Sequence, residues 1–154
     1  MAQFSDREGR EWSVSINVST IKRVREQAET NLLDVLEDGA KLLAALYDDP
    51  IRLVEVLYAV CEPQIRQREL TPEQFGEGFA GDILLEAADA LLDGLTDFFQ
   101  RPEQRRMLRA FRSKVNAAVK LRSEAAIRTV EAIDPELIHA QATSGSVTAL
   151  NSAV

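Results

Sequence analysis

The alternation of apolar and polar side chains is clearest near the start of the chain, over residues 11–18. The apolar positions in this run are Trp12, Val14, Ile16 and Val18. A period of two, carried by aromatic and β-branched residues, predicts a half-buried β-strand. Phe4 lies upstream of the turn-like residues 6–9, so we expect a short partner strand and a hairpin. Such a hairpin is marginal alone and must pack on helices or pair with another chain.

After residue 18 the apolar spacing becomes helical. Ser19 or Thr20 is expected to cap a first helix, because a hydroxyl accepts a hydrogen bond from a free N–H of the first turn. Asn31 is expected to begin a short apolar helix that stops at Gly39, where glycine accepts the left-handed conformation.

Two junctions predict helix starts with particular clarity. Asp49 and Pro50 combine a capping carboxylate with a residue that needs no N–H at the first helical position. Pro63 is expected to end or kink the helix that begins there. Thr71 and Gln74 have the spacing of a capping box, in which each side chain accepts from the other residue's backbone.

Glycines weaken the segment that follows, so we expect a short helix and a bend at Gly76, Gly78 and Gly81. Asp82 can restart a leucine-rich helix that runs to about Phe98. Pro102 then opens a long helical pattern to about Ile133, roughly 48 Å at 1.5 Å per residue.

The predicted fold class is mainly α, a compact helical bundle with a short N-terminal β-hairpin or strand and a long C-terminal amphipathic helix. Three segments are expected. Residues 1–100 form an acidic helical body with the β element, residues 101–140 carry the long basic helix, and residues 141–154 form an uncharged, disordered tail.

Charge changes sign between the first two segments. Residues 1–100 hold nine Lys or Arg against twenty Asp or Glu, whereas residues 101–128 hold nine against two. A chain with opposite charge on its body and on one helix is suited to bind a partner or another copy of itself. We therefore expect a binding protein.

Composition narrows the class of protein further. The 154 residues are 45% hydrophobic and 28% charged, as in globular domains, and no apolar run approaches the roughly 20 residues of a membrane span. Neither a secretory signal nor a second cysteine beside Cys61 is present, which favours a reducing, cytoplasmic location. No membrane association is expected.

Catalytic chemistry is not indicated. Cys61 and His139 are the only cysteine and histidine, which excludes His/Cys zinc sites, and Cys61 is expected to be an inert core thiol. Carboxylate pairs such as Asp89 and Asp93 are expected on a solvated helix face, and residues 76–81 lack the lysine of a phosphate loop. We predict no catalytic, cofactor-binding or metal-binding residues, and no enzyme.

The basic helix permits two interpretations. Its arginines and apolar seam can bind a partner, or the helix can pack across the acidic body with its arginines facing Asp and Glu residues. Nucleic-acid binding through residues 101–128 is the weaker alternative, since no aromatic platform accompanies the charge. The predicted partner-binding residues are Leu85, Leu92, Phe99, Arg105, Arg109, Phe111, Arg112 and Val115.

Residues 8–100 resemble the small tail assembly chaperones of tailed bacteriophages and prophages. The resemblance is carried by Gly9-Arg10-Glu11-Trp12 before the alternating strand, by Asp49-Pro50, and by Leu70-Thr71-Pro72-Glu73-Gln74-Phe75-Gly76. It implies a non-enzymatic protein of the host cytoplasm that binds the tape measure protein and tail tube subunits, and that forms homo-oligomers in many cases. The alternative is a structural or adaptor protein that is retained in the virion.

Overall fold

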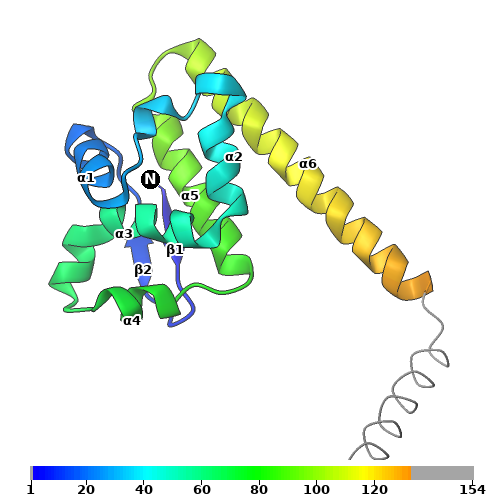
Figure 1. Ribbon diagram of the computed structural model, residues 1–154, viewed down its shortest axis with the longest axis horizontal. Helices are drawn as coiled ribbons and strands as arrows, with labels where there is room; N and C mark the ends of the chain where they lie inside the picture. The colour runs from blue at the N-terminus through cyan, green and yellow to red at the C-terminus, as the bar shows by residue number, and fades with distance from the viewer. Residues whose placement is uncertain (1, 133–154) are drawn as a thin grey trace, which may run out of the picture. The chain divides into compact units, whose positions relative to one another are not determined.

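The computed structural model describes residues 2–132, which form six α-helices and a two-stranded antiparallel sheet (Figure 1). The elements in chain order are β1 (Gln3–Ser5), β2 (Glu11–Ser13), α1 (Val18–Ala28), the 3₁₀ turns η1 (Leu32–Asp34) and η2 (Glu37–Gly39), α2 (Lys41–Asp48), α3 (Pro50–Gln67), α4 (Pro72–Glu77), α5 (Asp82–Phe98) and α6 (Pro102–Ala132). The predicted mainly α class with an N-terminal hairpin is confirmed. The tail predicted for residues 141–154 lies outside the described residues.

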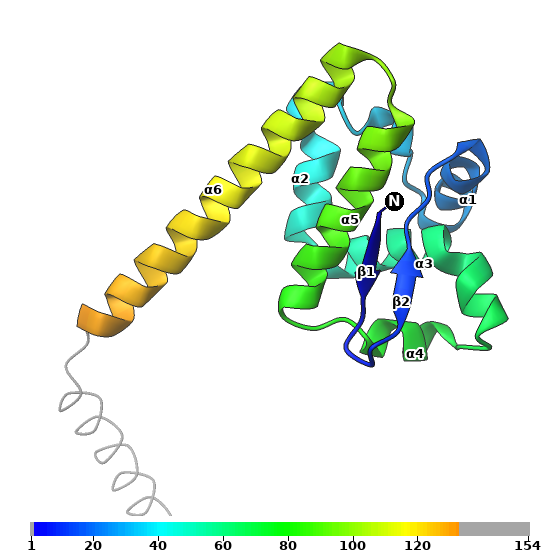
Figure 2. The ribbon, with the colours of Figure 1, turned by 180° about the vertical axis from the view of Figure 1, so that it is seen from behind.

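The hairpin is shorter than the alternating pattern suggests. Phe4 pairs with Trp12, and β2 ends at Ser13. Val14 still donates its N–H to the carbonyl of Ala2, but the chain then turns into α1, which leaves Val18 75% exposed. The alternation therefore predicted the strand correctly and its end incorrectly. Figure 2 shows the hairpin between α5, beside β1, and α3, beside β2.

Helix starts follow the predicted caps with one exception. Asp49 accepts from the N–H groups of Ile51 and Arg52, and the Thr71–Gln74 capping box is complete in both directions. The first helix is capped by Asn17, whose Oδ1 accepts from the Thr20 N–H at 2.9 Å, and not by Ser19 or Thr20. The side-chain oxygen of Asn17 can reach the Thr20 N–H because the backbone of residue 17 is still extended.

The apolar segment after Asn31 forms two 3₁₀ turns in place of the predicted short helix. Asn31 does cap the first turn, by accepting from the Leu33 N–H. Three consecutive residues, Asp38, Gly39 and Ala40, then adopt positive φ angles, which an α-helix does not allow. The segment is therefore a compact connection between α1 and α2.

The core is one cluster between the hairpin and the helices of residues 2–112. Its fully buried side chains include Trp12, Leu57, Phe75 and Leu91, from four different elements. The first turns of α6 belong to it, because Leu108 is fully buried. Contacts divide the chain into two units, Met1–Arg112 and Ser113–Val154, so the boundary falls inside α6.

Candidate functional site

A hollow lined by apolar and polar side chains opens at the surface where the end of α1, the middle of α3 and the start of α4 meet. Its volume is about 420 Å³. We call it the α3–α4 groove, and it is lined by Glu26, Gln27, Ala28, Glu29, Val54, Glu55, Tyr58, Pro72 and Phe75.

The floor of the groove is an aromatic cluster. Phe75 is fully buried, and its ring centroid lies 5.0 Å from that of Trp12, 5.8 Å from that of Tyr58 and 5.0 Å from that of Phe79. The capping box at Thr71 determines where α4 begins and thus where Phe75 enters the core. The floor of the groove is therefore held in place by the packing of Phe75 against three other aromatic rings.

A second hollow of about 310 Å³ continues the groove along α3 towards its first turn. It shares Val54 and Glu55 with the first hollow and adds Ile51, Phe79 and Leu84 to the apolar lining. Ile51 is 73% exposed, which is a large exposure for an apolar side chain beside other apolar residues. The two hollows share lining residues and so adjoin along α3, and together we call their apolar residues the apolar strip. An exposed apolar strip along a helix is the kind of surface that binds the apolar face of an amphipathic helix.

Carboxylates border this strip. Glu26 and Glu29 come from the end of α1, and Glu55 comes from α3, next to Val54. Within residues 2–132 none of the three is in an ion pair. Arg52 shares a neighbouring hollow with Glu29 and Glu55, so the border keeps a net negative charge. An apolar floor with a negative border favours a cationic amphipathic partner.

The predicted arginine face of α6 is mostly used to hold the helix on the body. Arg105 donates through Nε to the carbonyl oxygen of Phe99 at 2.9 Å, and Arg112 forms an ion pair with Asp93. The hydrogen bond that Arg112 donates to Asp93 raises the pKa of Arg112 above its usual value. Arg112 thus faces an acidic residue of the body, as the packing interpretation expects, whereas Arg105 contacts a backbone carbonyl and Arg109 is exposed.

Tyr47 of α2 completes this attachment. Its hydroxyl donates to Asp89 of α5 at 2.8 Å, and its ring lies 5.6 Å from that of Phe111. Burial, and then the bond to Asp89, raise the pKa of the Tyr47 hydroxyl well above its usual value. Asp89 and Asp93 are therefore structural partners of Tyr47 and Arg112, and not a cation site on a solvated face.

The leucine face of α5 is not available as a partner surface. Leu92 is 1% exposed and Phe99 8% exposed, so both belong to the core, and Leu85 is half-buried. The prediction that Leu92 and Phe99 line a binding surface is wrong, because the hairpin and neighbouring helices cover that face. Phe111 and Val115 are half-buried, the first in the body unit and the second in the other unit.

Cys61 is buried in α3. Burial raises the pKa of the Cys61 thiol to about 12, as expected for an inert core cysteine. Among residues 2–132 no three His, Cys, Asp or Glu side chains form a group that could hold a metal ion. His139 lies outside this range.

Sequence reasoning missed the α3–α4 groove, although a signal for it exists. The apolar residues of α3 cover too wide an arc for one buried face. Leu53, Leu57 and Val60 are buried, while Ile51 and Val54, three residues apart, form a second stripe beside them. A second apolar stripe on one helix indicates either deeper burial or a binding surface.

Comparisons with known proteins add no relative. No protein-family model, curated protein or solved structure matches this chain. No helix among residues 2–132 combines the length and the apolarity that crossing a bilayer requires.

Proposed function

We propose that this protein is a non-enzymatic assembly chaperone that holds a helical segment of another polypeptide in the α3–α4 groove. The observation that carries the proposal is the exposed apolar strip from Ile51 to Pro72, bordered by Glu26, Glu29 and Glu55. Such a surface covers the apolar face of an amphipathic helix, while its carboxylates meet basic residues beside that face. Binding of this kind keeps an aggregation-prone partner in solution without any chemical step.

The resemblance to phage tail assembly chaperones indicates a tape measure protein as the partner. A tape measure protein is long, helical and apolar, and it needs protection until tail tube subunits assemble around it. The groove replaces the α5 leucine face as the surface proposed for this work. The resemblance covers residues 8–100, which include every residue that lines the groove.

The test is co-expression with a phage tape measure protein. Wild type should raise the soluble fraction of that protein and purify with it. Ile51→Glu should abolish both effects, because it places a carboxylate on the apolar strip. Val18→Glu is the matched control, since Val18 is equally exposed at 75% and lines neither hollow of the strip.

Two outcomes would contradict the proposal. One is a tape measure protein whose solubility does not change with wild type. The other is equal loss in both variants, because the effect would then come from charge and not from the groove. Mass spectrometry of purified particles separates the chaperone from a structural adaptor, since a chaperone should be absent or scarce in them.

A further inference from the structure

The part of α6 beyond Arg112 carries an apolar seam that is largely exposed in the described residues 2–132. Val115, Val119, Ala126 and Val130 follow one another at intervals of four or seven, on one helix face. Val119 is 37% and Val130 68% exposed. The seam continues the stripe of Leu108 and Phe111, the two residues by which α6 packs on the body.

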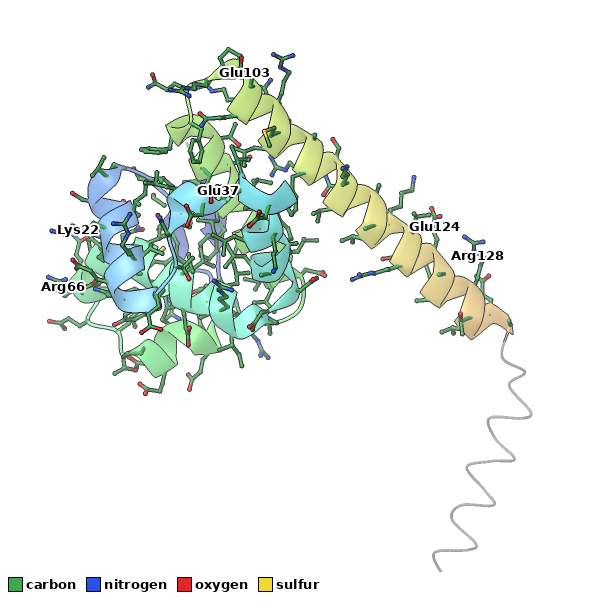
Figure 3. All side chains as sticks on the ribbon, turned by 45° about the horizontal axis from the view of Figure 1, so that its top comes forward. Lys22, Glu37, Arg66, Glu103, Glu124 and Arg128 are labelled. Atoms are coloured by element: carbon green, nitrogen blue, oxygen red, sulfur yellow. The ribbon has the colours of Figure 1, made fainter. Side chains whose placement is uncertain are left out.

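A single charge interrupts this seam. Arg122 lies three residues after Val119 and four before Ala126, on the same face. The nearest acidic residue, Glu124, is two positions on, about 200° around the helix, and pairs with Arg128 at 3.9 Å. Figure 3 shows Glu124 and Arg128 together on α6. Whatever covers the seam must therefore supply a carboxylate to Arg122.

This requirement argues against pairing between two copies of the same segment. If two such seams packed together, each Arg122 would contact apolar side chains or the Arg122 of the other copy. Neither copy could supply a carboxylate, because Glu124 and Glu131 lie away from the seam. An acceptor surface needs apolar area and carboxylates that are free of ion pairs. Both are present on the body of the same chain, in the α3–α4 groove.

We propose that the α3–α4 groove of one copy binds the α6 segment 113–132 of a second copy. Val119 and Ala126 would cover the apolar floor, and Arg122 would meet the border formed by Glu26, Glu29 and Glu55. The segment has a net charge of +2, whereas residues 1–100 carry −11, so the long-range field favours the same association.

This inference rests on the groove of the proposed function and deepens it. The groove is filled by another copy until the polypeptide partner arrives and displaces the helix. Such self-occupation hides an exposed apolar strip while no partner is present. A reciprocal exchange closes a two-fold dimer.

The experiment uses charge exchange in the full-length chain, measured by sedimentation velocity at several concentrations. Wild type should self-associate. Arg122→Glu alone, and the double variant Glu26→Arg/Glu55→Arg alone, should each weaken association roughly tenfold or more, because like charges then face each other. An equimolar mixture of the two should associate again, because each helix then meets a groove of opposite charge.

The matched control is Lys120→Glu, which makes the same change of charge on nearly the opposite side of the same helix. It should associate like wild type. A monomeric wild type, an Arg122→Glu variant that associates normally, a Lys120→Glu variant that is equally weakened, or a mixture that stays dissociated would each overturn the inference.

The two proposals fail separately. A monomeric wild type that still solubilises the tape measure protein through Ile51 refutes the exchange and leaves the chaperone intact. A charge-exchange dimer without any effect on the tape measure protein refutes the chaperone and leaves the exchange intact.

Discussion

At the scale of single residues, Asp6 does the most to fix the turn of the hairpin and to hold Arg10, which contacts α4. Its buried carboxylate accepts from the Trp12 indole at 3.0 Å, from the N–H groups of Glu8 and Arg10, and from Arg10 Nε at 2.8 Å. Arg10 also reaches the carbonyl oxygen of Gln74 in α4. Burial raises the pKa of Asp6, but the bonds from Trp12 and Arg10 outweigh it, so its pKa lies below the usual value.

Asp6→Asn should lower the free energy of unfolding at pH 7 by about 2 kcal/mol, because the amide cannot accept all four bonds and loses the charge. Since the folded pKa of Asp6 is depressed, its stabilisation is complete above the unfolded pKa of about 4 and is lost as pH falls through the folded value. Urea unfolding at pH 7 and at acid pH should therefore show less acid sensitivity in the variant. Glu8→Gln, at an exposed position, is the control, and equal acid sensitivity of Asp6→Asn and wild type would contradict this role.

Position 78 requires glycine because its backbone lies close to the Asp6 carboxylate. A Cβ at position 78 would lie 2.8 Å from Asp6 Oδ2 and 3.0 Å from the Asp6 Cβ, whereas one at Gly76 would meet nothing within 4 Å. Gly78→Ala should cost about 1–3 kcal/mol through forced displacement. Gly76→Ala in α4 should be neutral or stabilise by up to about 1 kcal/mol. Thermal unfolding of the two variants gives the comparison, and equal midpoints would contradict it.

At the scale of elements, α3 shows how a residue of a neighbouring helix stabilises a helix that contains a proline. Pro63 lies inside α3, which continues to Gln67, so of the two predicted outcomes, an end or a kink, the end is wrong. Proline cannot donate to the carbonyl of Ala59, one turn earlier. Arg23 of α1 donates to that carbonyl and to the carbonyl of Val60 at 3.1 Å. The arginine thus replaces the bond that the proline removes.

Arg23→Ala should destabilise the protein by about 1–3 kcal/mol, because it leaves a buried carbonyl without a donor. The cost of Arg23→Ala should be about 1 kcal/mol smaller in a Pro63→Ala background, since the alanine N–H can donate to the carbonyl of Ala59. Chemical unfolding of the four proteins in this cycle measures the coupling. Lys22→Ala, on the outer side of α1 (Figure 3), should change little, and additive costs in the cycle would refute the replacement.

At the scale of the whole molecule, α6 belongs to two units. Leu108 is fully buried in the core, while Leu121, thirteen positions on, is 62% exposed. The net charge of −7 is unevenly distributed along the chain. The acidic residues concentrate in the body, and half of the basic residues lie between positions 101 and 128.

Leu108→Ala should lower the free energy of unfolding by about 2–5 kcal/mol, as for other leucines removed from a core. Leu121→Ala should change it by no more than about 0.5 kcal/mol. Urea denaturation followed by circular dichroism compares the same substitution at two positions of one helix. Similar losses would mean that the second unit contributes to the stability of the first.

The sequence by itself determined the features that depend on neighbouring residues. The cap at Asp49 and the capping box at Thr71 each need only a side chain and the N–H groups within one turn. The hairpin follows from alternation over a few residues. The inert state of Cys61 also followed from its place on a helix.

Only the tertiary structure decided which apolar face is covered and which is open. Leu92 on α5 and Ile51 on α3 look equivalent as apolar positions of amphipathic helices, yet one is buried by the hairpin and its neighbours and the other lines a groove. The same holds for Pro63, whose effect depends on an arginine forty residues earlier in the chain. Burial is a property of what lies opposite a residue in space, and no local pattern contains that information.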